Sequence, residues 1–215
     1  MNDWHVPGFT STGSKRPEAL FGAAADAAAG PGPPTQMTQA AGCRVWDSEG
    51  RAYVDYVMAL GAVALGYGHP DVNRAAEQAI AAGVTGPLPP VLEEELAEAL
   101  ARQIPWLERV RFLKTGAEAV AAAVRLARVA TGRERVLGCG YHGWLDWCQG
   151  GEGVPAATRA LYAELPFNDV EGSRRLIREA GNRLAVVVTE PVVVLEPTRE
   201  WLEVVRAETT RVGAV

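Results

Sequence analysis

The chain has 215 residues, of which 48% are hydrophobic and 22% are charged, a composition typical of a globular protein rather than a disordered one. Its formal net charge is -5, with acidic and basic residues interspersed, so it offers no broad basic surface and nucleic acid is not an expected partner. The sequence has no stretch of membrane-spanning length and no apolar signal-peptide core, and we expect a cytoplasmic protein without a membrane partner.

The first 42 residues are rich in Gly, Pro, Ala and Thr, which predicts an irregular arm with little core of its own. Ordered structure is expected from Arg44. Strand-like runs at residues 44 to 46 and 52 to 57 flank Asp47-Ser48-Glu49-Gly50, whose turn residues favour a hairpin. We assign residues 1 to 68, the arm and the hairpin, to a first small domain.

Two helices are predicted next. Pro70 suits the first turn of a helix, where its missing N–H costs nothing, and this helix should run to about Ala82. A second helix is predicted over residues 90 to 103, because leucines recur at four-residue spacing from Leu92 to Leu100 with glutamates between them. We expect this second helix to have one apolar face and one solvated face.

From Val110 onward, short apolar strands alternate with helices, which predicts an α/β fold with a mostly parallel sheet and helical crossovers. The predicted strands are residues 110 to 113, 135 to 138 and 184 to 189, and the predicted helices are residues 117 to 131, 170 to 180 and 198 to 211. The run Leu-Ala-Val-Val-Val from Leu184 lacks polar alternation, so we expect a buried strand parallel to residues 135 to 137. Residues 69 to 215 form the second predicted domain.

The most informative stretch turns from the first of these strands through Thr115-Gly116-Ala117 into an alanine-rich helix. A helix N-terminus presents unsatisfied N–H groups and a partial positive charge, and small residues let a phosphate approach the backbone. Gly116 and Ala117 are therefore candidate phosphate donors. The alternative, that Thr115 only caps a helix, stays open at this point.

A second stretch, Gly138-Cys139-Gly140-Tyr141-His142-Gly143, matches the spacing of a dinucleotide-binding fingerprint. We discount this match, because the fingerprint needs a helix to open within the motif and residues 144 to 149 run into further glycines. We interpret the stretch as a pocket-lining loop in which Tyr141 stacks on a flat heteroaromatic ring. Packing of these aromatic residues into the core is the open alternative.

Other polar residues give weaker signals. Glu190 follows the buried strand, at the carboxyl end where functional groups gather, although a carboxylate that only reaches solvent is equally compatible. The three histidines are far apart in sequence and lack ligands at suitable spacing, so no metal site is predicted. They are His5, His69 and His142. The three cysteines lack zinc-binding spacing and are expected to be reduced thiols. They are Cys43, Cys139 and Cys148.

In combination and in order, the motifs resemble the class III aminotransferases, nearest the glutamate-1-semialdehyde aminomutase branch of these pyridoxal-phosphate enzymes. The stretches that carry this resemblance are Val45-Trp46-Asp47-Ser48-Glu49-Gly50, Leu65-Gly66-Tyr67-Gly68-His69-Pro70, Thr115-Gly116-Ala117-Glu118-Ala119, Tyr141-His142-Gly143-Trp144 and Glu190-Pro191. The resemblance implies a fold-type I transferase, of which this chain holds the arm, the small hairpin and the first half of the large domain.

The resemblance also implies pyridoxal 5'-phosphate as cofactor, an amino-acid or amino-aldehyde substrate, and a homodimer for the complete protein. The residues it implies at the cofactor are Thr115, Gly116, Ala117, Tyr141, His142 and Glu190. Gly116 and Ala117 would hold the phosphate and Tyr141 would stack on the pyridine ring, with His142 beside it. In the family a later strand supplies an aspartate to the ring nitrogen, and Gly213-Ala214-Val215 resembles its beginning.

The Schiff-base lysine of the family comes from a still later strand, and this chain has only two lysines, Lys15 and Lys114. Lys114 lies two residues before the glycine turn, where an ion pair or a solvated strand end is the expected role. We therefore predict no catalytic residue within these 215 residues and no activity of the chain by itself. The alternative function is that of a non-catalytic remnant or an interaction module of the same fold.

Overall fold

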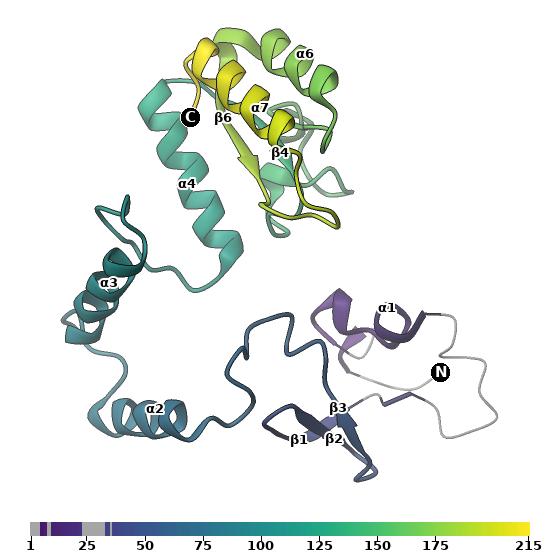
Figure 1. The fold of residues 1–215 in the computed structure, drawn as a ribbon, viewed down its shortest axis with the longest axis vertical. Helices are drawn as coiled ribbons and strands as arrows, with labels where there is room; N and C mark the ends of the chain where they lie inside the picture. The colour runs from purple at the N-terminus through teal and green to yellow at the C-terminus, as the bar shows by residue number, and fades with distance from the viewer. Residues whose placement is uncertain (1–4, 8–9, 23–32, 35) are drawn as a thin grey trace. The chain divides into compact units, whose positions relative to one another are not determined.

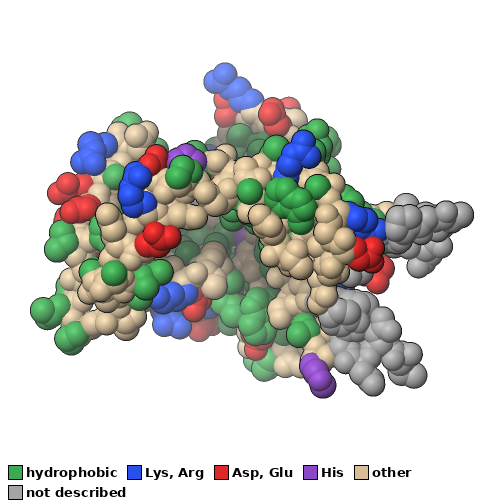
Figure 2. Space-filling view, turned by 90° about the horizontal axis from the view of Figure 1, so that it is seen from below, with side chains coloured by type: hydrophobic (Ala, Val, Ile, Leu, Met, Phe, Trp, Pro, Cys, Tyr) green, Lys and Arg blue, Asp and Glu red, His purple; other side chains and the backbone are tan. Residues whose placement is uncertain are grey.

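The structure is a computed structural model that describes residues 5–7, 10–22, 33–34 and 36–215. The chain divides into two compact units, residues 1–91 and 92–215, whose elements are labelled in Figure 1. The domain boundary predicted after residue 68 stays a prediction. Within the described ranges, no helix has the length and hydropathy of a membrane span. On the face seen in Figure 2, Lys and Arg side chains are interspersed with Asp and Glu.

The first unit contains a three-stranded antiparallel sheet of β1 (Met37–Ala41), β2 (Arg44–Asp47) and β3 (Ala52–Val54), in the order β1-β2-β3. The predicted hairpin is confirmed as β2 and β3. The predicted irregular arm is wrong for β1 and for the short helix α1 (Pro17–Phe21). Four of the five β1 residues are exposed, so this strand has no periodic apolar pattern and is held through its pairing with β2.

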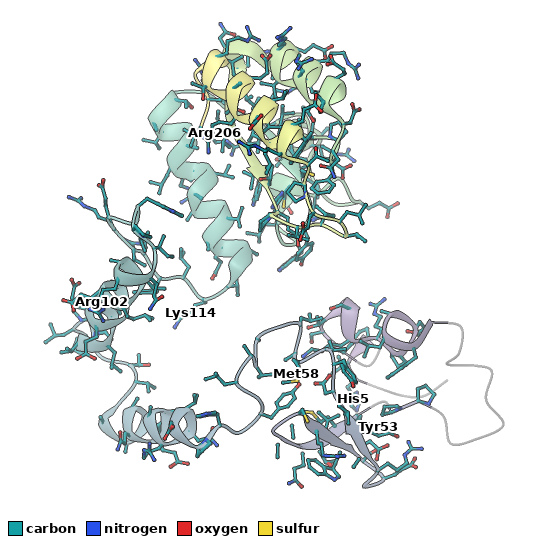
Figure 3. The ribbon with its side chains drawn as sticks, in the orientation of Figure 1. His5, Tyr53, Met58, Arg102, Lys114 and Arg206 are labelled. Carbon is teal, nitrogen blue, oxygen red and sulfur yellow. The ribbon has the colours of Figure 1, made fainter. Side chains whose placement is uncertain are left out.

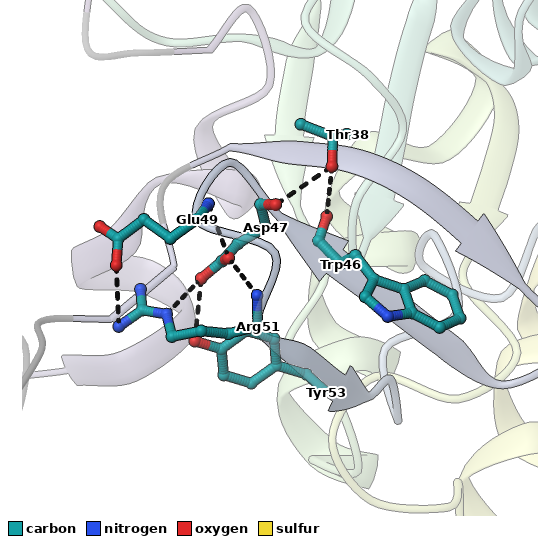
Figure 4. A network of polar contacts seen from close by, with 6 residues as sticks. All are labelled: Thr38, Trp46, Asp47, Glu49, Arg51 and Tyr53. Atoms are coloured by element: carbon teal, nitrogen blue, oxygen red, sulfur yellow. Dashed lines mark hydrogen bonds and ion pairs between the residues drawn. The ribbon is translucent and has the colours of Figure 1, made fainter.

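The hairpin turn is closed around the carboxylate of Asp47, whose residue is only 3% exposed. Asp47 accepts hydrogen bonds from the N–H groups of Glu49 (3.0 Å) and Arg51 (2.9 Å), from Arg51 Nε (2.6 Å) and from the Tyr53 hydroxyl (3.0 Å), as Figure 4 shows. Burial by itself would raise the pKa of Asp47, but these donors outweigh it and lower the pKa from 3.8 to about 2.

This arrangement predicts a pH dependence of the hairpin. Because the folded pKa of Asp47 is depressed, its stabilisation is present above the ordinary carboxyl pKa and is lost as the pH falls toward about 2. A titration of the Asp47 carboxyl carbon by NMR should have its midpoint near 2, and Tyr53→Phe, which removes one donor, should raise it. A midpoint at the ordinary value in the wild-type chain would contradict the proposed role of the four donors.

The next two predicted helices are confirmed as α2 (Pro70–Ala82) and α3 (Val91–Gln103). Pro70 occupies the first turn of α2 as expected, and Gly83 ends it with a positive φ of 95°. Neither helix has a buried residue. The two ends of α2 therefore follow from local signals, Pro70 and Gly83, and burial in a core does not account for either helix.

The second unit is built on a parallel sheet of β4 (Arg135–Cys139), β5 (Tyr162–Glu164) and β6 (Leu184–Thr189), in the order β5-β4-β6. The parallel pairing predicted for β4 and β6 is confirmed. The burial predicted for β6 is found only in part, because Val187 and Val188 are partly exposed. The strand predicted at residues 110 to 113 is wrong, since that segment is irregular and pairs with no strand in the described part of the chain.

Helices cover both faces of this sheet, as in Figure 1. On one face, α4 (Gly116–Thr131) packs against β6 through a core that includes Val124, Ala127 and Val136. On the other face lie α6 (Val170–Ala180) and α7 (Arg199–Val212). The remaining helical segments are short: η2 (Gly13–Lys15), η4 (Asp146–Cys148), α5 (Ala156–Arg159) and η5 (Gly181–Arg183). The predicted α/β layers are thus present.

The last residues of the chain return to the sheet. The N–H of Val215 donates to the carbonyl of Ala185 (3.0 Å), and the N–H of Val187 donates to the carbonyl of Val215 (2.9 Å). These two bonds to residues i and i+2 of β6 follow the pattern of a parallel ladder. Val215 is thus paired with β6 on the side of that strand that does not face β4.

Candidate functional site

The start of α4 is a complete capping box. Thr115 Oγ1 accepts from the Glu118 N–H (3.2 Å), and Glu118 Oε2 accepts in return from the Thr115 N–H (3.0 Å) and the Lys114 N–H (3.1 Å). The capping interpretation of Thr115 is therefore confirmed. It leaves the N–H groups of Gly116 and Ala117 without an acceptor in the described part of the chain. Capping and anion binding are thus compatible, because they use different donors.

The space beside the Gly116 Cα is open, since a Cβ placed there would meet no atom within 4 Å. At Ala117 the situation differs. A Cβ placed on Gly143 would lie 2.4 Å from the Ala117 Cβ, and Gly143 has a positive φ of 100°. The residues 140–143, which we call the Tyr141 loop, therefore lie directly against the first turn of α4, and only glycine fits at this contact.

The Tyr141 loop is held at both ends by hydrogen bonds. The N–H of Tyr141 donates to Glu190 Oε2 (3.0 Å), while the carbonyl of Gly143 accepts from Gln149 Nε2 (2.7 Å). Although its N–H is held, Tyr141 is 73% exposed, so it does not pack into the core as the alternative interpretation expected. That interpretation holds for Trp147, whose ring packs edge-on against Tyr162 at a centroid distance of 6.0 Å.

His142 occupies a different environment from its neighbour. It is 6% exposed, its ring lies 6.1 Å from that of Trp147 at an interplanar angle of 27°, and its Nε2 is buried without a hydrogen-bond partner in the described structure. Burial lowers the pKa of His142, and the nearby charge of Glu190 opposes this only in part. The ring is thus favoured in its neutral form.

A cavity of about 320 Å³ borders the Tyr141 loop. Its lining consists of Gly140, Tyr141, His142, Cys148, Gln149, Gly150, Tyr162, Ala163 and Glu164. Gly116 and Ala117 are not among these residues, so this cavity does not include the candidate phosphate donors of α4.

Lys114 is not among the residues that line this cavity. Lys114 is exposed, its backbone N–H is bound by Glu118, and its side chain in Figure 3 extends from the loop before α4 and points away from the helix. Lys15 belongs to the first unit. The sequence did not indicate that Gln149 binds the carbonyl of Gly143, because the spacing of these two residues belongs to no motif.

The family model described as "Aminotransferase class-III" matches residues 26–211. Glutamate-1-semialdehyde 2,1-aminomutase of Nitrosomonas europaea is 36% identical over 204 residues, covering 86% of this chain and 47% of the relative. The corresponding protein of Desulforapulum autotrophicum is 33% identical over 203 residues, with the same coverage. The chain thus spans about half the length of the curated relatives it matches.

Among solved structures, an omega-transaminase from Sphaerobacter thermophilus superposes with a TM-score of 0.80 at 31% identity, covering 87% of this chain and 48% of the other. A structure described as "Transaminase with PLP bound" also has a TM-score of 0.80 at 31% identity, covering 89% of this chain and 49% of the other. The shared fold and the cofactor named in the second description point to pyridoxal phosphate as the group that such a site holds.

Proposed function

Because the chain belongs to the class III aminotransferase family, we propose that it provides the phosphate-binding and ring-stacking part of an enzyme that transfers an amino group with pyridoxal phosphate. The family match covers residues 26–211 and so includes every residue of the candidate site. An amino acid or amino aldehyde as substrate, an aminomutase-like reaction, a homodimer and a cytoplasmic location are parts of this proposal.

One observation carries the proposal: two free N–H groups begin a 16-residue helix, and a loop bearing an exposed tyrosine rests on the same helical turn. A phosphate fits the free N–H groups of Gly116 and Ala117 and the open space at Gly116. A flat pyridine ring fits the exposed face of Tyr141. The residues present therefore fit the cofactor.

In the proposed enzyme, Gly116 and Ala117 hold the phosphate and Tyr141 orients the ring. When bound, pyridoxal phosphate would supply an electron sink for the bond that breaks at the substrate Cα. The proton that leaves this carbon needs an unprotonated base such as a lysine, and Lys114 points away from α4. We therefore expect the 215-residue chain by itself to bind the cofactor reversibly without transferring an amino group.

The proposal is tested by deleting one donor. Gly116 is the first residue of α4, and Thr115 before it is extended, so Gly116→Pro removes the N–H while proline remains compatible with the helix. Titration with pyridoxamine 5'-phosphate, which needs no Schiff base, should show affinity reduced about tenfold through loss of one charge-assisted hydrogen bond. Fluorescence of the bound pyridine ring reports the binding.

The matched control is Arg199→Pro, which places proline at the first position of α7 after another extended N-cap and should leave the affinity unchanged. Circular dichroism establishes that both variants keep their helices. A folded wild-type chain that does not bind pyridoxamine 5'-phosphate, or a Gly116→Pro variant that binds as tightly as the wild type, would contradict the proposal.

A further inference from the structure

Glu190 directly follows β6 in the chain and lies beside the start of the Tyr141 loop, which follows β4. Its N–H donates to the carbonyl of Cys139 (2.9 Å), which extends the pairing of β4 and β6 by one residue beyond Thr189. Its side chain then folds back over Gly140, because a Cβ at Gly140 would lie 2.5 Å from the Glu190 Cβ and 2.6 Å from its Oε2. The backbone of the loop and the carboxylate of Glu190 are thus in direct contact.

This contact fixes the residue that bears the exposed ring. Glu190 Oε2 accepts from the Tyr141 N–H at 3.0 Å, and a carboxylate acceptor makes this bond stronger than one between neutral groups. Two residues later, Gly143 is fixed by Gln149 and by its contact with Ala117. With both ends of the loop held, the position of the Tyr141 Cα relative to α4 depends on Glu190.

We propose that Glu190 is a positioning residue that sets the place of the Tyr141 ring through the Tyr141 N–H, without itself touching the cofactor. This inference rests on the proposed function, because it assumes that Tyr141 stacks on the cofactor ring. It assigns Glu190 a role different from the direct cofactor contact implied by the family resemblance. A ring held in its binding orientation before the ligand arrives loses less freedom on binding.

The nature of the bond predicts the order of two variants. Glu190→Gln keeps an oxygen that accepts the Tyr141 N–H, whereas Glu190→Ala leaves the N–H without this acceptor. If Glu190 acts as the acceptor, Glu190→Gln should bind pyridoxamine 5'-phosphate within about twofold of the wild type, and Glu190→Ala about tenfold more weakly. A role that needs the negative charge at the cofactor would weaken both variants alike.

The experiment combines two readouts on the 215-residue chain. Hydrogen exchange of the Tyr141 amide, followed by NMR without ligand, should be faster in Glu190→Ala than in the wild type and should stay slow in Glu190→Gln. Titration with pyridoxamine 5'-phosphate gives the affinities. Glu152→Ala, which removes an exposed carboxylate after the loop, is the charge-matched control and should change neither readout.

A double-mutant cycle then shows whether Glu190 acts through Tyr141. In a Tyr141→Ala background, Glu190→Ala should cause no further loss of affinity, because there is no ring left to position. Additive losses, equal losses in the Gln and Ala variants, or unchanged Tyr141 amide exchange in Glu190→Ala would each overturn the inference. A folded wild-type chain that does not bind the ligand would overturn both the proposed function and the positioning role. Slow exchange of the Tyr141 amide in that chain would still show that Glu190 accepts this hydrogen bond.

Discussion

Truncation of Trp201 to alanine is expected to lower the free energy of unfolding of residues 92–215 by about 3–5 kcal/mol, the usual cost of removing a large buried aromatic side chain. Trp201 is a residue of α7 and is fully buried in the core that this helix shares with α6 and the sheet. Its Nε1 donates to Ser173 Oγ (2.8 Å), and its ring lies 5.2 Å from that of Phe167. The substitution therefore leaves a cavity and removes the hydrogen bond that Ser173 Oγ accepts, although Ser173 still donates to the carbonyl of Pro166. Urea unfolding followed by circular dichroism measures the loss.

Trp144→Ala is the control for this prediction, because Trp144 is 76% exposed and its removal should change the stability by less than about 0.5 kcal/mol. Trp201→Phe should fall between the two, since phenylalanine fills part of the cavity but donates no hydrogen bond. Equal stabilities of Trp201→Ala and Trp144→Ala would show that α7 does not pack on the sheet as described.

Gly143→Ala is expected to be the most damaging small substitution at the site. The new Cβ would lie 2.4 Å from the Ala117 Cβ and 2.9 Å from the Ala117 Cα, at a φ of 100° that disfavours any side chain. Backbone strain and overpacking together cost about 2–4 kcal/mol. Displacement of the loop from α4 should weaken the binding of pyridoxamine 5'-phosphate by about a hundredfold or more.

The matched control is Gly151→Ala, where a Cβ meets nothing within 4 Å, and no loss of affinity is expected. The double variant Gly143→Ala/Ala117→Gly removes the closest of the two contacts and should recover part of the loss, whereas the strain at position 143 remains. If Gly143→Ala binds the ligand as the wild type does, the loop does not rest on the helix in the way the structure describes.

Strong local signals made much of the second unit predictable from sequence. Thr115 and Glu118 form the capping box of α4, and the β-branched run of β6 identified a strand that runs parallel to β4, although β4 and not β6 is the middle strand of the three. The apolar run at residues 110 to 113 failed as a prediction because a strand also needs a partner, and none pairs with it in the described structure. Strand β5 was missed because three residues are too few to show periodicity.

The sequence named candidate site residues but did not predict how they are arranged. Sequence patterns identified Gly116, Ala117 and Tyr141, since each belongs to a motif. They did not reveal that Gly143 rests on Ala117 or that Glu190 binds the N–H of Tyr141. These contacts join segments 26 and 49 residues apart in sequence. Such contacts follow from the packing of α4 and β6 around β4, which local propensity does not specify.

The most direct measurement is a map of backbone amide shifts by NMR as pyridoxamine 5'-phosphate is added to the 215-residue chain. A phosphate held by the start of α4 should move the amide resonances of Gly116 and Ala117 most, because these N–H groups lack an acceptor in the described structure. The Tyr141 resonances should move with them as the ring stacks. Shifts confined to other segments, or no shifts in a folded chain, would contradict a cofactor site at α4 and the Tyr141 loop.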